Sequence, residues 1–91
     1  MYSKETTVVN RIGLQAKAAS EFTRHATQFS SDIKITNLDD GRTGDAKSII
    51  SVIGLSLPKG TRIAIEADGD DELEAVENLI ALVDDRFGEE D

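Results

Sequence analysis

The chain has 91 residues, of which 38% are hydrophobic and 31% are charged, and it contains no cysteine. This size and composition predict one small folded domain with a single core, and they exclude a disulfide framework, a thiolate metal site and a cysteine nucleophile. The formal net charge of −8 argues against direct contact with nucleic acid, because such binding depends on cationic contacts to phosphates.

The first half of the chain predicts a strand, a helix and a hairpin. Residues 4–9 are rich in β-branched side chains, which favours a strand. From about Gln15, apolar residues recur at the period of an amphipathic helix, and this stripe consists of Ala19, Phe22, Ala26 and Phe29. Residues 32–37 alternate as a strand does, residues 39–41 suit a turn, and residues 42–46 supply a weak second strand.

A short helix is expected after Ser48, which precedes a dense apolar run and is a preferred N-cap residue. So short a helix cannot expose all of its apolar side chains. We expect Val52, together with Leu55 or Leu57, to face the core, and the exposed side to carry Ile49, Ile50 and Ile53.

The last third predicts a strand and the longest helix. Residues 61–67 alternate cleanly, with Ile63, Ile65 and Ala67 facing inward. After Gly69, three acids lie at the positive end of a helix dipole, and the apolar stripe that follows consists of Leu73, Val76, Leu79 or Ile80, Val83 and Phe87. The acids of residues 68–72 lack the spacing of a calcium-binding loop. We therefore expect no metal and no cofactor.

The elements follow the order β-α-β-β-α-β-α, and each helix has one apolar stripe. We therefore predict an α+β fold in which three helices cover one face of a single sheet. Residues 1–88 would form the domain, and residues 89–91 a frayed acidic tail. No stretch reaches the roughly 18 apolar residues of a membrane helix, and the N-terminus lacks the apolar centre of a signal peptide. We expect a cytoplasmic protein that does not contact a membrane.

Three short segments occur in an order and spacing typical of one family: residues 13–20 (GLQAKAAS), residues 47–49 (KSI) and the helix start at residues 69–76. Together they resemble the HPr family of phosphocarrier proteins over nearly the whole chain, with one or two extra residues around 38–42. The resemblance implies an open-faced βαββαβα sandwich with a four-stranded antiparallel sheet. It also implies a protein that is not an enzyme.

Gln15 departs from the family pattern. The resemblance implies a histidine at this position, which accepts a phosphoryl group from enzyme I and passes it to a soluble domain of a sugar permease. A glutamine amide is not a nucleophile at neutral pH, so we expect no catalytic residue and no relay. Lys17 in place of the usual arginine and Ala18 in place of the usual proline fit a loss of phosphoryl transfer.

The segment from Lys47 to Ile49 resembles the regulatory serine segment of the family, which HPr kinase/phosphorylase modifies from ATP in Gram-positive bacteria. A phosphate of about −1.5 to −2 charge on Ser48 would suit a helix N-terminus. The resemblance implies that the exposed isoleucines dock the kinase and a LacI-type catabolite control protein. The expected partner-binding set is Gln15, Lys17, Ser20, Arg24, Lys47, Ile49, Ile50 and Ile53.

Gln15 combined with a retained Ser48 resembles the Crh-like members of the HPr family, which regulate carbon catabolite repression. We hypothesise that the chain phosphorylated on Ser48 is a corepressor for the control protein. Two alternatives stay open: an altered relay through His25, and a binding module without phosphorylation. His25 lies more than a turn from Gln15, which favours a structural role. The resemblance allows a monomer or a dimer formed by exchange of the first strand.

Overall fold

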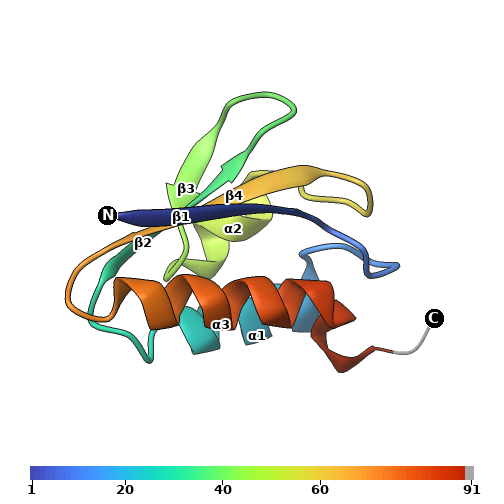
Figure 1. The fold of residues 1–91 in the computed structure, drawn as a ribbon. Coiled ribbons are helices and arrows are strands. Elements are labelled where there is room, and N and C mark those ends of the chain that lie inside the picture. Colours follow the sequence, from blue (N-terminus) through green and yellow to red (C-terminus); the bar gives the residue numbers. More distant parts are fainter. Residues whose placement is uncertain (90–91) are drawn as a thin grey trace.

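The computed structural model describes residues 1–89 and confirms the predicted order of elements (Figure 1). A short 3₁₀ turn follows the last helix. The elements are β1 (Tyr2–Thr7), α1 (Ala16–Ala26), β2 (Asp32–Asn37), β3 (Thr43–Asp45), α2 (Ile49–Gly54), β4 (Arg62–Asp68), α3 (Glu72–Asp84) and the 3₁₀ turn η1 (Arg86–Gly88).

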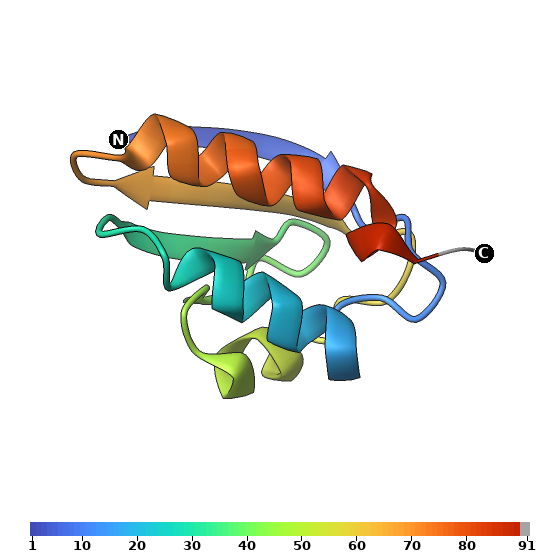
Figure 2. The same ribbon diagram turned by 90° about the horizontal axis from the view of Figure 1, so that it is seen from below.

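One four-stranded antiparallel sheet organises the molecule, with the strand order β1-β4-β2-β3. A central row of the register joins Lys4, Ile65, Ile35 and Gly44. The three helices lie on one face of the sheet (Figure 2). Helix α3 packs against β1 and β4, α1 lies between α3 and α2, and α2 contacts β3. The predicted open-faced sandwich is therefore confirmed.

The core lies between the sheet and the helices, where the alternation of the strands places their apolar residues. Ile63, Ile65 and Ala67 are buried as predicted, and Val52, Leu55 and Leu57 are all buried as well. Helix α1 contributes Ala19, Phe22 and Ala26, and α3 contributes Ala75, Val76, Leu79, Ile80 and Val83. No helix within residues 1–89 is both long and apolar enough to span a bilayer.

The prediction for Leu73 was wrong, since this side chain is 57% exposed. Ala75 belongs to the buried stripe of α3, which shifts the centre of the stripe toward Leu79. Leu73 lies roughly 90° around the helix from that centre. Phe87, which was also predicted to lie on the apolar stripe of this helix, lies outside α3. The helix ends at Asp84, and positive φ angles at Arg86 and Phe87 turn the chain, so that Phe87 packs partly buried against the core.

Two other predicted boundaries were displaced. The first strand lies two residues earlier than expected, and the first helix ends at Ala26 rather than reaching Phe29. Phe29 follows in a turn but still packs partly buried against the core. In both places, an apolar residue that the pattern assigned to a strand or helix lies instead in the connection that follows it and is at least partly buried there.

Asp71 fastens the turn between α1 and β2 to the start of α3. Its carboxylate accepts hydrogen bonds from the Ser31 hydroxyl, from the Ser30 amide at 2.8 Å and from the Ser31 amide at 3.0 Å. These donors, the Ser31 hydroxyl first, lower the pKa of Asp71 to about 2. The acidic start of α3 is therefore also a tertiary contact.

Candidate functional site

The loop that leads into α1 is held rigidly against the loop that follows α2. The Leu14 amide donates to Leu57 O at 2.9 Å, and Asn10 Nδ2 donates to Gly13 O at 2.8 Å. Gly13 has φ +81°, and a Cβ at this position would lie 2.5 Å from Leu57 O. Only glycine allows this close approach. The loop therefore presents Gln15 in a fixed place.

Gln15 is the N-cap of α1, with extended backbone and no hydrogen bond from its side chain to the helix. Its carbonyl accepts from the amides of Ala18 and Ala19 at 3.1 and 3.3 Å. Ala16 has φ +48°, which is a strained conformation for an alanine and is found preferentially at functional sites. The exposed helix start has the geometry of an anion site but holds no nucleophile at residue 15.

The exposed positions of α1 form one stripe of predicted site residues. Lys17, Ser20 and Arg24 all face solvent and follow each other at helical spacing. Arg24 Nη2 contacts Glu21 Oε2 at 2.7 Å, whereas Lys17 contacts no ion-pair or hydrogen-bond partner through its side chain among the described residues. Lys17 thus presents an exposed cation at the start of α1.

The C-terminal segment lies beside the start of α1. Lys17 and Glu89 line two neighbouring hollows, one with Arg11 and Ile12 and the other with Phe87. Both carboxylate oxygens of Glu89 lie 3.4 Å from Asn10 Nδ2. Glu89 was assigned to the predicted acidic tail, and the other two tail residues lie outside the described part of the chain.

Ser48 is the N-cap of α2, as the sequence predicted. Its Oγ accepts from the Ser51 amide at 3.3 Å, and its carbonyl accepts from the Val52 amide at 3.0 Å. The side chain is half-buried. A hydroxyl with one long hydrogen bond at the positive end of a helix can accept a phosphoryl group without the loss of a strong contact.

Lys47 has a structural partner. Its Nζ donates to Phe29 O at 2.7 Å, just beyond the end of α1. The backbone amide of Lys47 donates to Asp45 Oδ1 at 2.9 Å. These two contacts fix the segment that precedes Ser48 between α1 and β3.

Helix α2 also presents an apolar surface, which we term the α2 isoleucine patch and which consists of Ile49, Ile50 and Ile53. These side chains are 39%, 81% and 42% exposed, respectively, while Val52 on the opposite side is buried. Helices α1 and α2 lie side by side (Figure 2). The structure therefore brings the predicted site residues together on one helix pair, with Ser48 at the edge of the patch.

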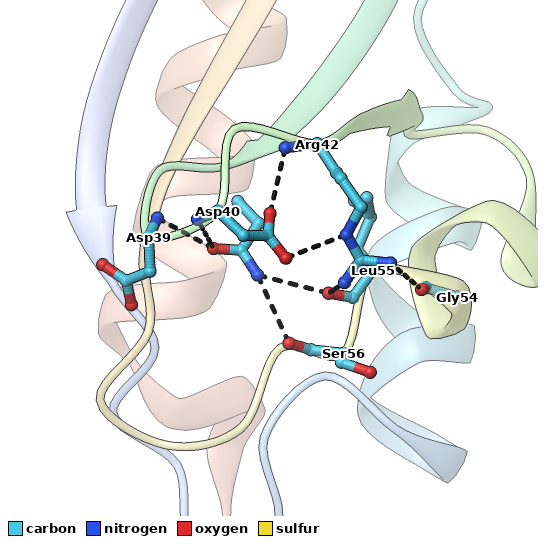
Figure 3. Close-up of polar contacts among 7 residues, drawn as sticks. Asp39, Asp40, Arg42, Gly54, Leu55 and Ser56 are labelled. Atoms are coloured by element: carbon cyan, nitrogen blue, oxygen red, sulfur yellow. Dashed lines mark hydrogen bonds and ion pairs between the residues drawn. The ribbon is translucent and has the colours of Figure 1, made fainter.

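One set of residues that contacts this site was not predicted from the sequence. Asn37 and Arg42, which flank the turn between β2 and β3, contact the C-terminal end of α2, and Asp40 in the turn binds Arg42 (Figure 3). An asparagine at an inward position of β2 is a weak signal for such a contact, because a buried amide needs hydrogen-bond partners. Nothing in the sequence indicates which partners these are.

Comparison with known proteins places these features in one group. The family described as "PTS HPr component phosphorylation site" matches residues 2–85. The chain is 42% identical to the phosphocarrier protein HPr of Cupriavidus necator over 98% of each chain. Its structure resembles HPr-C-His from Thermoanaerobacter tengcongensis, with a TM-score of 0.94, 36% identity and 99% of each chain covered. A structure of Bacillus subtilis Crh, described as a swapped dimer, has a TM-score of 0.73 and 36% identity, covering 94% of this chain and 97% of that one.

Proposed function

The chain belongs to the HPr family of the phosphotransferase system, whose members are phosphocarriers rather than enzymes, and we propose that this member is a regulator switched by phosphorylation of Ser48. The observation that carries the proposal is the exposed α2 isoleucine patch beside a serine N-cap, combined with a glutamine at the start of α1. Both HPr and Crh proteins occur among its relatives, and this combination favours the Crh-like branch.

A histidine relay is disfavoured by the chemistry of both candidate positions. The Gln15 amide offers no nucleophilic nitrogen. His25 lies in the last turn of α1, at the negative end of the helix dipole, and its Nε2 is 3.8 Å from the Glu21 carboxylate. A phosphoryl group on that ring would meet two sources of negative charge, and the one cation beside Nε2, the Arg24 guanidinium at 3.5 Å, is itself paired with Glu21. Nδ1 of His25 lies 3.1 Å from Asn78 Oδ1, which supports a structural role.

Phosphorylation of Ser48 would add about two negative charges beside an apolar patch while the fold stays intact. We propose that an HPr kinase/phosphorylase adds this group from ATP. The modified chain would then bind a LacI-type catabolite control protein as corepressor. The α2 isoleucine patch of the chain would pack against an apolar surface of the control protein, and the cations Lys17 and Arg24 would contact acidic groups of that protein. The chain would act in the cytoplasm and would change transcription without contacting DNA itself.

The oligomeric state forms part of this proposal. The two states that the resemblance allows are a monomer and a dimer that exchanges β1. That strand lies at the opposite edge of the sheet from β3, the strand that α2 contacts. The swapped dimer described for Bacillus subtilis Crh supports the second state. Sedimentation of the purified chain distinguishes them.

Two parallel incubations test the proposal: ATP with an HPr kinase/phosphorylase, and phosphoenolpyruvate with enzyme I. Intact mass and site mapping should show one stable phosphate on Ser48 in the first and none in the second. The Ser48→Ala variant should stay unmodified in both. Acid-labile phosphate on His25 would establish an altered relay instead, and no phosphate in either incubation would leave a binding module without phosphorylation.

A further inference from the structure

The turn between β2 and β3 holds the C-terminal end of helix α2 (Figure 3). The Arg42 guanidinium donates to Leu55 O at 2.8 Å and to Gly54 O at 3.2 Å. Its Nε donates to Asp40 Oδ2 at 2.8 Å. A cation that binds the last carbonyl groups of a helix satisfies acceptors that the helix leaves free, and it complements the negative end of the dipole.

The turn itself is rigidly built around Asn37. This buried side chain accepts from the Asp39 amide at 2.9 Å through Oδ1, and it donates to Leu55 O at 3.2 Å through Nδ2. The Arg42 amide donates to Asp40 Oδ1 at 2.9 Å. This amide and the guanidinium lower the pKa of Asp40, so its carboxylate stays charged beside the arginine. Arg42 is therefore held in place on both sides.

Helix α2 depends on contacts at its ends because it is short. It spans six residues, and isolated helices below about 12–15 residues are marginal in water. One side is anchored by the buried Val52, whereas Ile50 on the other side faces solvent. The N-terminal end has a single side-chain cap, with the 3.3 Å bond to Ser48. The contacts of Arg42 and Asn37 at the C-terminal end thus add to the anchoring that the burial of Val52 gives this helix.

We propose that Arg42 is a positioning residue for the Ser48 site, which acts by clamping helix α2 through its C-terminal carbonyl groups. The helix transmits the effect, since Arg42 binds one end of it and Ser48 caps the other. The clamp keeps Ser48 and the α2 isoleucine patch in one arrangement before a kinase binds. This inference rests on the proposed function for its consequence at Ser48, and on the geometry alone for its effect on the helix.

Amide hydrogen exchange tests the effect on the helix without any partner. The amides of Val52, Leu55 and Ser56 donate within or just after α2. In the Arg42→Met variant, their exchange should accelerate about five- to tenfold, the effect of losing a net hydrogen bond. The matched control is Arg62→Met, because Arg62 lies on β4 and pairs with Glu5 at 3.3 Å. Unchanged α2 exchange in Arg42→Met, or an equal acceleration throughout the chain, would overturn the inference.

Steady-state phosphorylation tests the consequence at Ser48. A loosened helix must be ordered on the kinase, so Arg42→Met should raise KM while kcat stays unchanged. The rise should be no larger than the roughly five- to tenfold exchange effect, since KM rises only as the fraction of chains with an ordered α2 falls. Arg42→Lys should recover only part of this loss, since an ammonium cannot bind two carbonyl groups and Asp40 as the planar guanidinium does. If Arg42 acted merely as a surface charge for docking, the Arg42→Lys variant would have the same KM as the chain without a substitution.

The Asp40→Asn variant separates the two explanations by sign. In the clamp, the loss of the carboxylate loosens Arg42 and raises KM. In charge-based docking, the loss of an acid beside a required cation lowers KM, and that result would overturn the inference. If the kinase does not phosphorylate even the chain without a substitution, the proposed function fails. The exchange measurement alone then decides whether Arg42 orders α2.

Discussion

Ile50 and Val52 lie two residues apart on helix α2 but face opposite ways, so alanine substitutions at the two positions separate docking from folding. Val52 is fully buried, whereas Ile50 is 81% exposed. Val52→Ala removes two carbons from the core at ~0.8 kcal/mol each, and the cavity adds to this, giving a loss of about 2 kcal/mol. For a domain of this size, that loss lowers Tm by about 8–16 °C. Ile50→Ala should change stability by less than about 0.5 kcal/mol, because alanine is also the better helix former.

The same pair gives the opposite result for docking. If the patch enters an apolar surface of the kinase, loss of three carbons at position 50 weakens binding by up to ~2.4 kcal/mol, and KM should rise about ten- to fiftyfold. Thermal unfolding followed by circular dichroism and steady-state phosphorylation of Ser48 measure the two effects. A large loss of stability in Ile50→Ala, or an unchanged KM for this variant, would refute the assignment of the patch as a docking surface.

Two further predictions concern the parts of the fold that hold the site. Because its hydrogen bonds lower the pKa of Asp71 from 3.8 to about 2, the stability from this carboxylate should be present above about pH 4 and lost as pH falls toward 2. Asp71→Asn should flatten this acid limb of the urea midpoint, and an unaltered limb would contradict the contact with Ser31. Gly13→Ala should destabilise by at least ~2 kcal/mol in urea unfolding, since φ is +81° and the new Cβ would lie 2.5 Å from Leu57 O. A loss no larger than that of an exposed Gly60→Ala change would show that the loop adapts.

The periodic elements were predictable because each of them has one face toward the core and the other toward solvent. Strand β4 alternates between Ile63 and Ile65 inward and charged residues or Ala64 outward, and the structure buries the two isoleucines. The N-cap role of Ser48 was predictable for the same local reason. The exposure of Leu73 was not predictable, because several neighbouring residues of α3 are apolar. Only tertiary packing decides which of them form the centre of the buried face.

The contacts that support the site could not be predicted, because they join residues far apart in sequence through backbone atoms. Lys47 binds Phe29 O, and Arg42 binds Leu55 O, so no pairing of side-chain types identifies the partners. The positive φ of Ala16 is set by the loop before α1 and has no counterpart in composition. Local sequence thus indicates where the candidate functional residues are, and the tertiary structure determines how they are held.

The most direct test of the central claim is a binding titration of a purified LacI-type catabolite control protein with the chain before and after phosphorylation of Ser48. The phosphorylated form should bind at least about tenfold more tightly, the size of one charge-assisted hydrogen bond. The Ile50→Ala substitution should weaken this binding without altering the fold. Equal affinities of the two forms would contradict a switch at Ser48.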